Sequence, residues 1–315
     1  MNHKKAAVIG VGTIGLSTAI LALERGYHVT IYSDKPLSKT TSMKAAANFK
    51  PFLVANNVLT DRILELSSEY FERIVVQYAE MAGVHKHFHW EAMNAPREPE
   101  TFLSVMESFQ LVEQPHVPAG YALAWKYRTF FIDTSIFLPW LLQRFTENGG
   151  TLVLLDEPFT SLDQLAALPA DVVFNCTGLG ARELCHDAKV IPIKGQAALI
   201  DRQPEMDWSI SGDGFYMYPR RYNTVLGGTA EWQVDNELVD SEVIDRIIRG
   251  NQRFLPRLRA DAIQKTYAGL RPYREGSIRI ESENVNGKQL VHNYGHGGAG
   301  LTLCWGSAHV ALELV

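Results

Sequence analysis

Three glycines near the N-terminus have the spacing of a nucleotide-binding turn. Gly10, Gly12 and Gly15 lie between two apolar segments, and Asp34 follows the alternating segment after them. In such a motif the first glycine makes a tight turn, the second lets the backbone approach a pyrophosphate, and the third allows close packing of helix on strand. Asp34 would accept a hydrogen bond from an adenosine ribose. The motif predicts dinucleotide binding without separating NAD from FAD, and a βα turn with no ligand is the alternative.

A second glycine-rich run extends from His292 to Thr302. Its glycines expose backbone N–H groups just before an expected helix, whose N-terminal dipole favours an electron-rich ring or a phosphate. The alternative is a glycine-rich helix entry packed in the core. We interpret His296, inside this run, as a packing or hydrogen-bonding histidine and not as a catalytic base. A shorter glycine turn at Thr177-Gly178 follows an expected strand and also faces a nucleotide.

Arg271 stands between an apolar residue and a proline, at an expected strand end. The planar guanidinium fork of such an arginine suits a carboxylate ligand. Arg274 and Arg279 follow it closely. The alternative is that all three arginines are solvated or paired with nearby acids, namely Glu275, Glu281 and Glu283. Spacing alone leaves both interpretations open.

We expect the elements that position these residues to form two interleaved domains. The 315 residues of the chain exceed the roughly 250–300 that a single hydrophobic core accommodates. Hydrophobic periodicity predicts helices at 13–25, 57–83, 134–148 and 240–254, and strands at 5–9, 28–32, 151–155 and 171–175. Residues 84–133 and 190–278 contain mostly short extended segments, and 290–315 read as strand, glycine loop and helix. We expect an α/β fold in which a Rossmann-type domain (1–49, 134–190 and 279–315) is interleaved with an α+β substrate domain on a mixed sheet (50–133 and 191–278).

The composition narrows the class of partner. A formal net charge of -5, with 46% hydrophobic and 21% charged residues, is typical of a soluble globular protein and lacks the basic excess of nucleic-acid binders. The three cysteines have neither metal-ligand nor pairing spacing. No segment reaches the roughly 18 apolar residues of a membrane span, and glycines interrupt the N-terminal apolar stretch, which argues against a signal peptide. We expect a cytoplasmic protein without nucleic-acid, membrane or metal partners; homodimer formation stays open.

Taken together, the motifs resemble those of the D-amino-acid oxidase and D-aspartate oxidase family. The shared segments occur in the family's order along nearly the whole chain, although residues 55–125 show little likeness. They are Val8–Thr18, Phe174–Gly178, Lys194–Gln196, Tyr216–Pro219 with Leu226–Gly228, Gly269–Pro272, and His292–Gly298 with Gly300–Thr302. The C-terminal run is the most specific of these, and it favours FAD over NAD as the cofactor.

This resemblance implies roles for individual residues. Arg271 resembles the arginine that pairs with the substrate carboxylate, Tyr216 resembles the tyrosine that supports the same group, and the carbonyl of Gly298 would accept from the substrate amine. In the family the amine binds neutral, hydride leaves the α-carbon for the flavin without a side-chain base, and oxygen, the second substrate, becomes hydrogen peroxide. The expected FAD-binding residues are Gly10, Gly12, Thr13, Ile14, Gly15, Asp34, Thr40, Thr41, Ala46, Thr177, Gly178, Gly297, Gly298, Gly300, Leu301 and Thr302.

The substrate pocket departs from the family pattern. Lys50 stands where the family has a glutamine near the flavin, and we include it among the candidate catalytic residues. Gly212 replaces a lid tyrosine of the mammalian members, and Arg220 and Arg221 follow Tyr-Pro in place of a small turn. The added charge suggests a substrate with a second anionic or polar group, because a partly desolvated cation needs a counter-ion. The alternatives are that Arg220 and Arg221 form a solvated turn and that Lys50 lies over the flavin, where a cation would favour electron transfer to oxygen. Two alternatives to a D-amino-acid oxidase are an amine or imino-acid oxidase of a biosynthetic pathway and a non-catalytic flavin-binding protein.

Overall fold

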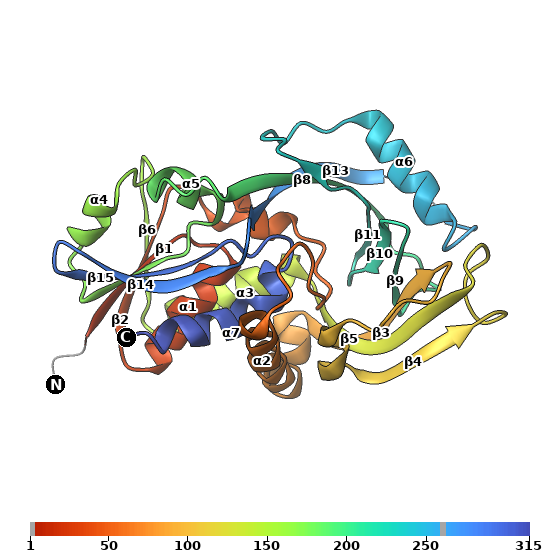
Figure 1. The fold of residues 1–315 in the computed structure, drawn as a ribbon, viewed down its shortest axis with the longest axis horizontal. Coiled ribbons are helices and arrows are strands. Elements are labelled where there is room, and N and C mark those ends of the chain that lie inside the picture. Colours follow the sequence, from red (N-terminus) through yellow and green to blue (C-terminus); the bar gives the residue numbers. More distant parts are fainter. Residues whose placement is uncertain (1–3, 259–262) are drawn as a thin grey trace.

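The computed structural model describes residues 4–258 and 263–315, which form two sheets (Figure 1). The first has six strands in the order β14-β15-β7-β1-β2-β6. Its neighbours are parallel except for the β14–β15 hairpin. The strands are β1 (Lys5–Ile9), β2 (His28–Ser33), β6 (Thr151–Leu154), β7 (Val172–Asn175), β14 (Arg279–Val285) and β15 (Lys288–Tyr294).

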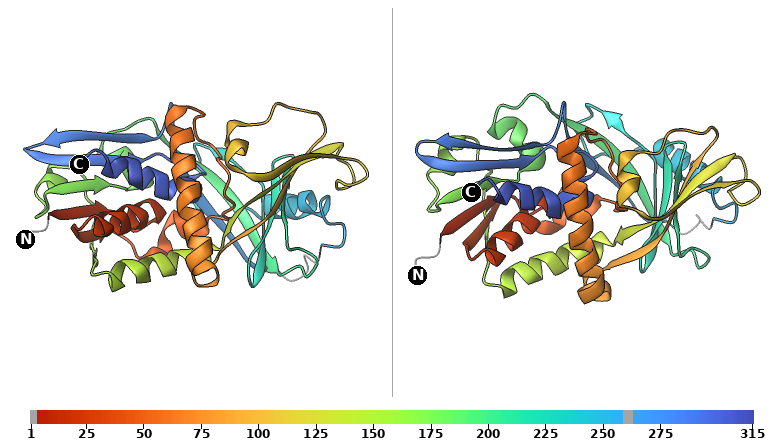
Figure 2. Two further views of the ribbon diagram at one scale, coloured as in Figure 1. Left: turned by 90° about the horizontal axis from the view of Figure 1, so that it is seen from below. Right: turned by 60° about the horizontal axis from the view of Figure 1, so that its bottom comes forward.

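Helices cover both faces of the first sheet. One face carries α1 (Thr13–Glu24), α3 (Thr134–Glu147) and α7 (Gly300–Leu312) over an apolar core, and α2 (Val58–Ala82) packs both on α7 and on a strand of the second sheet (Figure 2). The opposite face packs against the short helices α4 (Leu162–Ala166) and α5 (Ala181–Leu184). Single 3-10 turns occur at Leu37–Lys39, Thr41–Lys44, Thr101–Val105 and Gly178–Gly180.

The second sheet is mixed and follows the order β12-β8-β11-β10-β9-β3-β5-β4, with β13 also pairing with β8. Its neighbours are antiparallel apart from β3 and β9, which run parallel. One face packs against α6 (Ser241–Gln252) through a second apolar core, and the other faces the first sheet's domain. The strands are β3 (Val84–Met93), β4 (Glu107–Glu113), β5 (Leu123–Ile132), β8 (Val190–Asp201), β9 (Ser209–Gly212), β10 (Phe215–Pro219), β11 (Asn223–Gly227), β12 (Glu231–Trp232) and β13 (Ile263–Arg274).

Local signals in the sequence explain the helix boundaries that position the site. Gly12 precedes α1 as its N-cap, in extended backbone, so that the first turn of the helix follows the glycine motif directly. The side chain of Asn57 caps α2 by accepting from the Thr60 amide, and Gly83 ends that helix in the left-handed region at φ 63°. Asp133 caps α3 by accepting from the Ser135 amide. These caps fix where the chain turns toward the second sheet.

The structure confirms the expected fold class, and the helices and strands predicted from periodicity agree with it within about two residues. One prediction was wrong: Arg271 lies within β13 and not at a strand end, because β13 continues to Arg274 alongside β8. The predicted domain boundaries stay a proposal. Strands of the first sheet come from 5–33, 151–175 and 279–294, and those of the second from 84–132 and 190–274.

Candidate active site

A cavity of about 1330 Å³ is lined by residues of both sheets. It contains all four candidate catalytic residues, Lys50, Tyr216, Arg271 and Gly298. Of the expected cofactor-binding residues, every one except Gly15 lines it as well. Gly15 has the packing role that its motif predicts, since a methyl group there would lie 1.9 Å from the carbonyl oxygen of Gly10. The cavity therefore brings together residues that are far apart in the sequence.

One end of the cavity has the shape of a dinucleotide cradle. Gly10 adopts φ 106°, and a methyl group there would lie 2.7 Å from the carbonyl oxygen of Cys176. The N-terminus of α1 follows Gly12, so its positive dipole end faces the cavity, where the Thr13 amide donates to the Ser42 hydroxyl at 3.0 Å. Asp34, just after β2, lines the same end. These residues fit a pyrophosphate and a ribose, because bare backbone and an acid occur where each is needed.

The C-terminal glycine run and the segment around Lys50 contact each other where both line the cavity. The hydroxyl of Thr302, in the first turn of α7, accepts from the Lys50 amide at 3.2 Å and donates to the Lys50 carbonyl at 3.1 Å. The Gly298 amide donates to the carbonyl of Phe52 at 3.0 Å. A methyl group on Gly297 would lie 1.8 Å from the Leu53 carbonyl oxygen. Glycine at this position lets the two backbone segments approach closely.

Arg271 and Tyr216 line another part of the cavity, each against the backbone of a glycine. A methyl group on Gly195 would lie 2.2 Å from Nη2 of Arg271, and one on Gly227 would lie 2.0 Å from Cζ of Tyr216. Nη1 of Arg271 donates to the Thr229 carbonyl at 3.0 Å. Within the described residues no carboxylate forms an ion pair with Arg271, whereas the two following arginines pair with Asp187 and Glu281, respectively.

Burial raises the pKa of the Tyr216 hydroxyl, and the nearby guanidinium groups of Arg271 and Arg220 lower it only in part. The hydroxyl therefore stays protonated and is able to donate a hydrogen bond. Phe52, whose side chain is 45% exposed, lies with its ring 5.4 Å from the guanidinium carbon of Arg271. This contact was not predictable from the sequence, because no spacing links Phe52 to Arg271.

Lys50 already has a protein counter-ion. Its Nζ lies 2.6 Å from Oε2 of Glu91, a buried carboxylate that also pairs with Arg97 and accepts from the Tyr127 hydroxyl at 3.4 Å. Because Glu91 neutralises Lys50, the charge of Lys50 alone is no reason to expect an acidic substrate. Glu91 was not among the predicted site residues. The one available signal was an acidic residue inside the largely apolar end of β3.

Neither Arg220 nor Arg221 lines this cavity. Arg220 is buried, and its Nη2 donates to the Ala45 carbonyl at 2.7 Å and to the Thr134 hydroxyl at 2.9 Å, while Arg221 is exposed and pairs with Glu80. The idea that these two arginines hold an anionic substrate group is therefore wrong. Both serve the connection of β10 and β11 to the N-terminus of α3.

Gly212 lines the cavity but lies within β9, where a methyl group would be 2.8 Å from the Ala92 carbonyl oxygen.

His296 is buried, and its Nε2 lies 2.9 Å from the Ser307 hydroxyl, as expected of a hydrogen-bonding core histidine. Burial lowers its pKa to about 3, which keeps the ring neutral. The three cysteines are free thiols, as expected.

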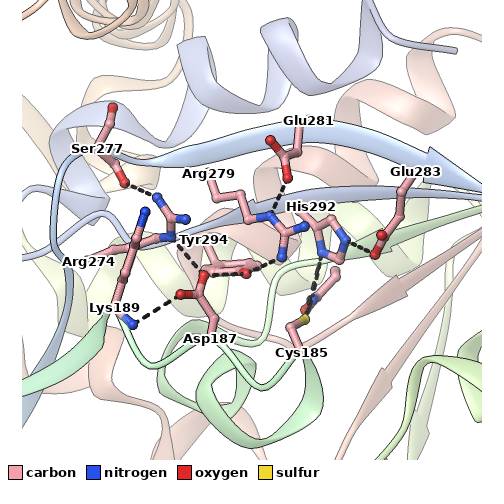
Figure 3. Close-up of polar contacts among 11 residues, drawn as sticks. Cys185, Asp187, Lys189, Arg274, Ser277, Arg279, Glu281, Glu283, His292 and Tyr294 are labelled. Atoms are coloured by element: carbon pink, nitrogen blue, oxygen red, sulfur yellow. Dashed lines mark hydrogen bonds and ion pairs between the residues drawn. The ribbon is translucent and has the colours of Figure 1, made fainter.

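A polar network supports the strand that carries Arg271 (Figure 3). Asp187 accepts from Nε of Arg274 and from the Tyr294 hydroxyl, each at 2.8 Å, and Arg279 donates to that hydroxyl at 2.7 Å. Next to it, Nε2 of His292 lies 2.6 Å from Glu283. The network ties β13, β14 and β15 to the segment after α5, and so fixes the position of the two sheets at the cavity.

The comparisons with known proteins agree with this geometry. The model of the FAD dependent oxidoreductase family matches residues 5–314. The D-amino-acid oxidase of Streptomyces coelicolor is 33% identical over 98% of this chain and 96% of its own, and that of Rubrobacter xylanophilus is 34% identical over 98% and 95%. The glycine oxidase structure from Geobacillus kaustophilus superposes with a TM-score of 0.84 at 15% identity, covering 99% of this chain and 94% of that one, which shows the fold.

The chain belongs to the FAD dependent oxidoreductase family, and its cofactor is FAD. Of the part of the chain that the structure describes, no helix is long and apolar enough to cross a membrane. In that same part, no cluster of three or more histidine, cysteine or acidic side chains has the arrangement of a metal site.

Proposed function

We propose that this FAD-dependent oxidoreductase oxidises a D-amino acid to the imino acid, which water converts into a 2-oxo acid and ammonia. Oxygen is the final electron acceptor and hydrogen peroxide the co-product. The observation that carries the proposal is Arg271: a cavity-lining guanidinium that has no carboxylate partner among the described residues and lies beside the partly buried Tyr216. Similarity to D-amino-acid oxidases over 98% of this chain supports the D-configuration of the proposed substrate.

Bound FAD supplies the hydride acceptor, and the residues of the chain bind and orient the substrate. Arg271 forks onto the carboxylate, the Tyr216 hydroxyl donates to the same group, and the Gly298 carbonyl accepts from the amine. Holding the α-carbon in a fixed orientation next to the acceptor contributes several kcal/mol to lowering the barrier. Glycines leave room for the two anchors, because a methyl group on Gly195 would collide with Arg271 and one on Gly227 with Tyr216.

We further propose that the domains divide at the predicted boundaries, 1–49, 134–190 and 279–315 for FAD and 50–133 and 191–278 for the substrate. The distribution of strands between the two sheets supports this division. The expected FAD contacts lie mainly on the first set and the substrate anchors Tyr216 and Arg271 on the second. The reaction would then take place where the two domains meet.

The experiment is a peroxide-release assay across D-amino acids, L-amino acids and simple amines. We expect peroxide from neutral D-amino acids, no peroxide from their L-enantiomers, and little from amines, which lack the carboxylate that Arg271 would bind. Equal rates with amines that have no carboxylate would contradict the role of Arg271. Binding of FAD without peroxide from any compound would point to another electron acceptor or to a non-catalytic protein.

A further inference from the structure

A row of side chains crosses the face of the second sheet that lines the active-site cavity. Ser211 of β9 is paired with Tyr216 of β10 on one side and with Glu91 of β3 on the other (strands labelled in Figure 1). Directly paired residues of neighbouring strands share a face of the sheet, and these three all line the cavity. The row leads from Tyr216, a proposed anchor of the substrate carboxylate, to the buried acid Glu91, about 10 Å away at two strand spacings.

The Tyr216 ring leans away from Ser211. On its other side Tyr216 is paired with Gly227, and a methyl group on Gly227 would lie 2.0 Å from Cζ of Tyr216. The ring therefore lies over Gly227 and does not cover Ser211, which is partly exposed. Tyr218, two residues along β10, stacks on this ring with centroids 4.5 Å apart and also lines the cavity. Ser211 therefore forms the cavity wall between the carboxylate anchors and Glu91.

The side chains at this part of the wall retain hydrogen-bonding capacity. The ammonium of Lys50 has three N–H donors, and Oε2 of Glu91, at 2.6 Å, takes one of them. Among the described residues this ammonium has no second carboxylate partner, and its side chain is 19% exposed. Oγ of Ser211 lies 3.0 Å from Nε2 of His89, and a hydroxyl that makes one hydrogen bond is able to make another. A ligand group at this place would therefore find both donors and an acceptor.

The charges around Glu91 cancel. Glu91 also pairs with Arg97, whose guanidinium carbon lies 4.3 Å from the centroid of the Trp125 ring, and Arg97 pairs in turn with Glu100 at 3.5 Å. Two cations, Lys50 and Arg97, are thus matched by two carboxylates. A second substrate carboxylate would meet Glu91 as well as Lys50, and its burial would cost solvation energy that no unpaired cation offsets. A neutral group that hydrogen-bonds would avoid this cost.

We propose that Lys50, Glu91 and Ser211 form a polar subsite for the substrate side chain, and that the substrate is a D-amino acid whose side chain carries a neutral hydrogen-bonding group, an amide or a hydroxyl. This inference rests on the proposed function, since the carboxylate must be held by Arg271 for the side chain to reach the subsite. The Lys50 ammonium and the Ser211 hydroxyl contact the substrate. Glu91 holds the ammonium in place.

Selectivity in this subsite comes from the cost of leaving polar groups without partners. An apolar side chain of the same shape would displace water from the Lys50 ammonium and the Ser211 hydroxyl without replacing the hydrogen bonds that the water made. An amide or hydroxyl replaces them. Because one of the two groups is charged, we expect the polar substrate to be preferred by about tenfold or more in kcat/KM.

The test compares peroxide release from D-asparagine, D-leucine and D-aspartate by the FAD-loaded enzyme. Their side chains have nearly the same branched shape and end in an amide, two methyl groups and a carboxylate, respectively. We expect kcat/KM for D-asparagine to exceed that for D-leucine by about tenfold or more, and to exceed that for D-aspartate as well. A value for D-leucine equal to or above that for D-asparagine would show that there is no polar subsite. A higher value for D-aspartate would show that the subsite takes an anion, which also overturns the proposal.

Matched variants separate substrate contact from packing, with the ratio of kcat/KM for D-asparagine to that for D-leucine as the readout. A general loss of folding or of FAD lowers both values alike and leaves their ratio unchanged. Ser211→Ala should lower the ratio by about threefold or more, and Lys50→Met by about tenfold. The control is Ser209→Ala: Oγ of Ser209 lies 2.8 Å from Nδ1 of the same His89, but Ser209 is buried outside the cavity lining.

The Ser209→Ala ratio should equal that of the wild type. An unchanged ratio in Ser211→Ala and Lys50→Met, or an equal fall in all three variants, would overturn the assignment of the subsite.

A second measurement depends neither on turnover nor on the folding of a variant. Succinamate and 4-methylpentanoate are asparagine and leucine without the amine, and calorimetric titration of the FAD-loaded wild type gives the affinity of each. We expect succinamate to bind about tenfold more tightly. Equal affinity, or binding of neither compound, would overturn the subsite. If no D-amino acid yields peroxide, the proposed function fails, while this comparison still decides whether the polar subsite exists.

Discussion

The guanidinium of Arg271 lies flat against the backbone of Gly195, at a position where any side chain would collide with it. Gly195 is in β8, paired in register with Gly269 of β13, two residues from Arg271. Because Gly195 has no side chain, the guanidinium of Arg271 is able to lie against the neighbouring strand. Its remaining donors face the cavity, where the proposal places the substrate carboxylate.

Gly195→Ala should displace Arg271 without removing it. The colliding atom is the end of a flexible side chain, so we expect the protein to fold and to retain FAD. Loss of one well-aligned, charge-assisted hydrogen bond costs about 1.5–3 kcal/mol, or about 10- to 150-fold in KM for the D-amino acid. Steady-state kinetics measure this, and an unchanged KM would show that Arg271 does not bind the carboxylate.

Arg271→Ala should lower kcat/KM for D-amino acids more than Gly195→Ala does, because no cation remains to pair with the carboxylate in a buried site. Tyr216→Phe should be milder, within the roughly 1–3 kcal/mol of one lost hydrogen bond. FAD affinity, measured by fluorescence titration, should stay near that of the wild type in both variants. A loss of FAD comparable to the loss of substrate binding would place these residues in the cofactor site instead.

Lys50→Met should lower the free energy of unfolding, because it leaves the buried Glu91 carboxylate with Arg97 as its remaining cation. We expect about 1–3 kcal/mol by chemical denaturation, and a smaller loss when Glu91→Gln is added. Activity on D-aspartate should not fall selectively relative to D-alanine, since Glu91 already neutralises Lys50. A selective loss on D-aspartate would revive the acidic-substrate hypothesis; equally slower flavin reoxidation with every substrate would give Lys50 a role toward oxygen.

Asp187 should make stability depend on pH in acid. Burial acts to raise its pKa, but the hydrogen bonds from Arg274 and Tyr294 outweigh this and hold the pKa below the ordinary value of 3.8. The resulting stabilisation is complete above about pH 3.8 and is lost as the pH falls toward the folded-state value. Asp187→Asn should be less stable than the wild type near neutral pH, by roughly 1–3 kcal/mol, and the difference should shrink in acid. A difference independent of pH would contradict this account.

The parts of the site that local sequence determines were predictable. Gly10, Gly12 and Gly15 act within one strand-turn-helix unit, so their spacing alone predicts their roles. Contacts between distant segments were not predictable. Glu91 of β3 neutralises Lys50, which lies outside any strand, and Gly195 of β8 makes room for Arg271 of the neighbouring β13.

The two buried histidines of β3 show the same limit in a different form. His87 and His89 are two residues apart in β3, as the printed sequence shows. Their hydrogen-bond partners are set by β9, which lies parallel beside β3. Periodicity predicts that alternate residues share a face, and it does not predict which distant strand supplies the partners. Arg220 was misread for that reason, since its partners come from the N-terminus of α3.

The most direct test of the central claim is anaerobic mixing of the FAD-loaded protein with the two enantiomers of a neutral amino acid such as alanine, followed by the flavin absorbance. We predict that the D-enantiomer bleaches the flavin stoichiometrically, that the L-enantiomer does not, and that admission of oxygen restores the absorbance with one peroxide per flavin. Bleaching by the L-enantiomer at an equal rate, or by neither across a panel of neutral and acidic side chains, would contradict the proposed function.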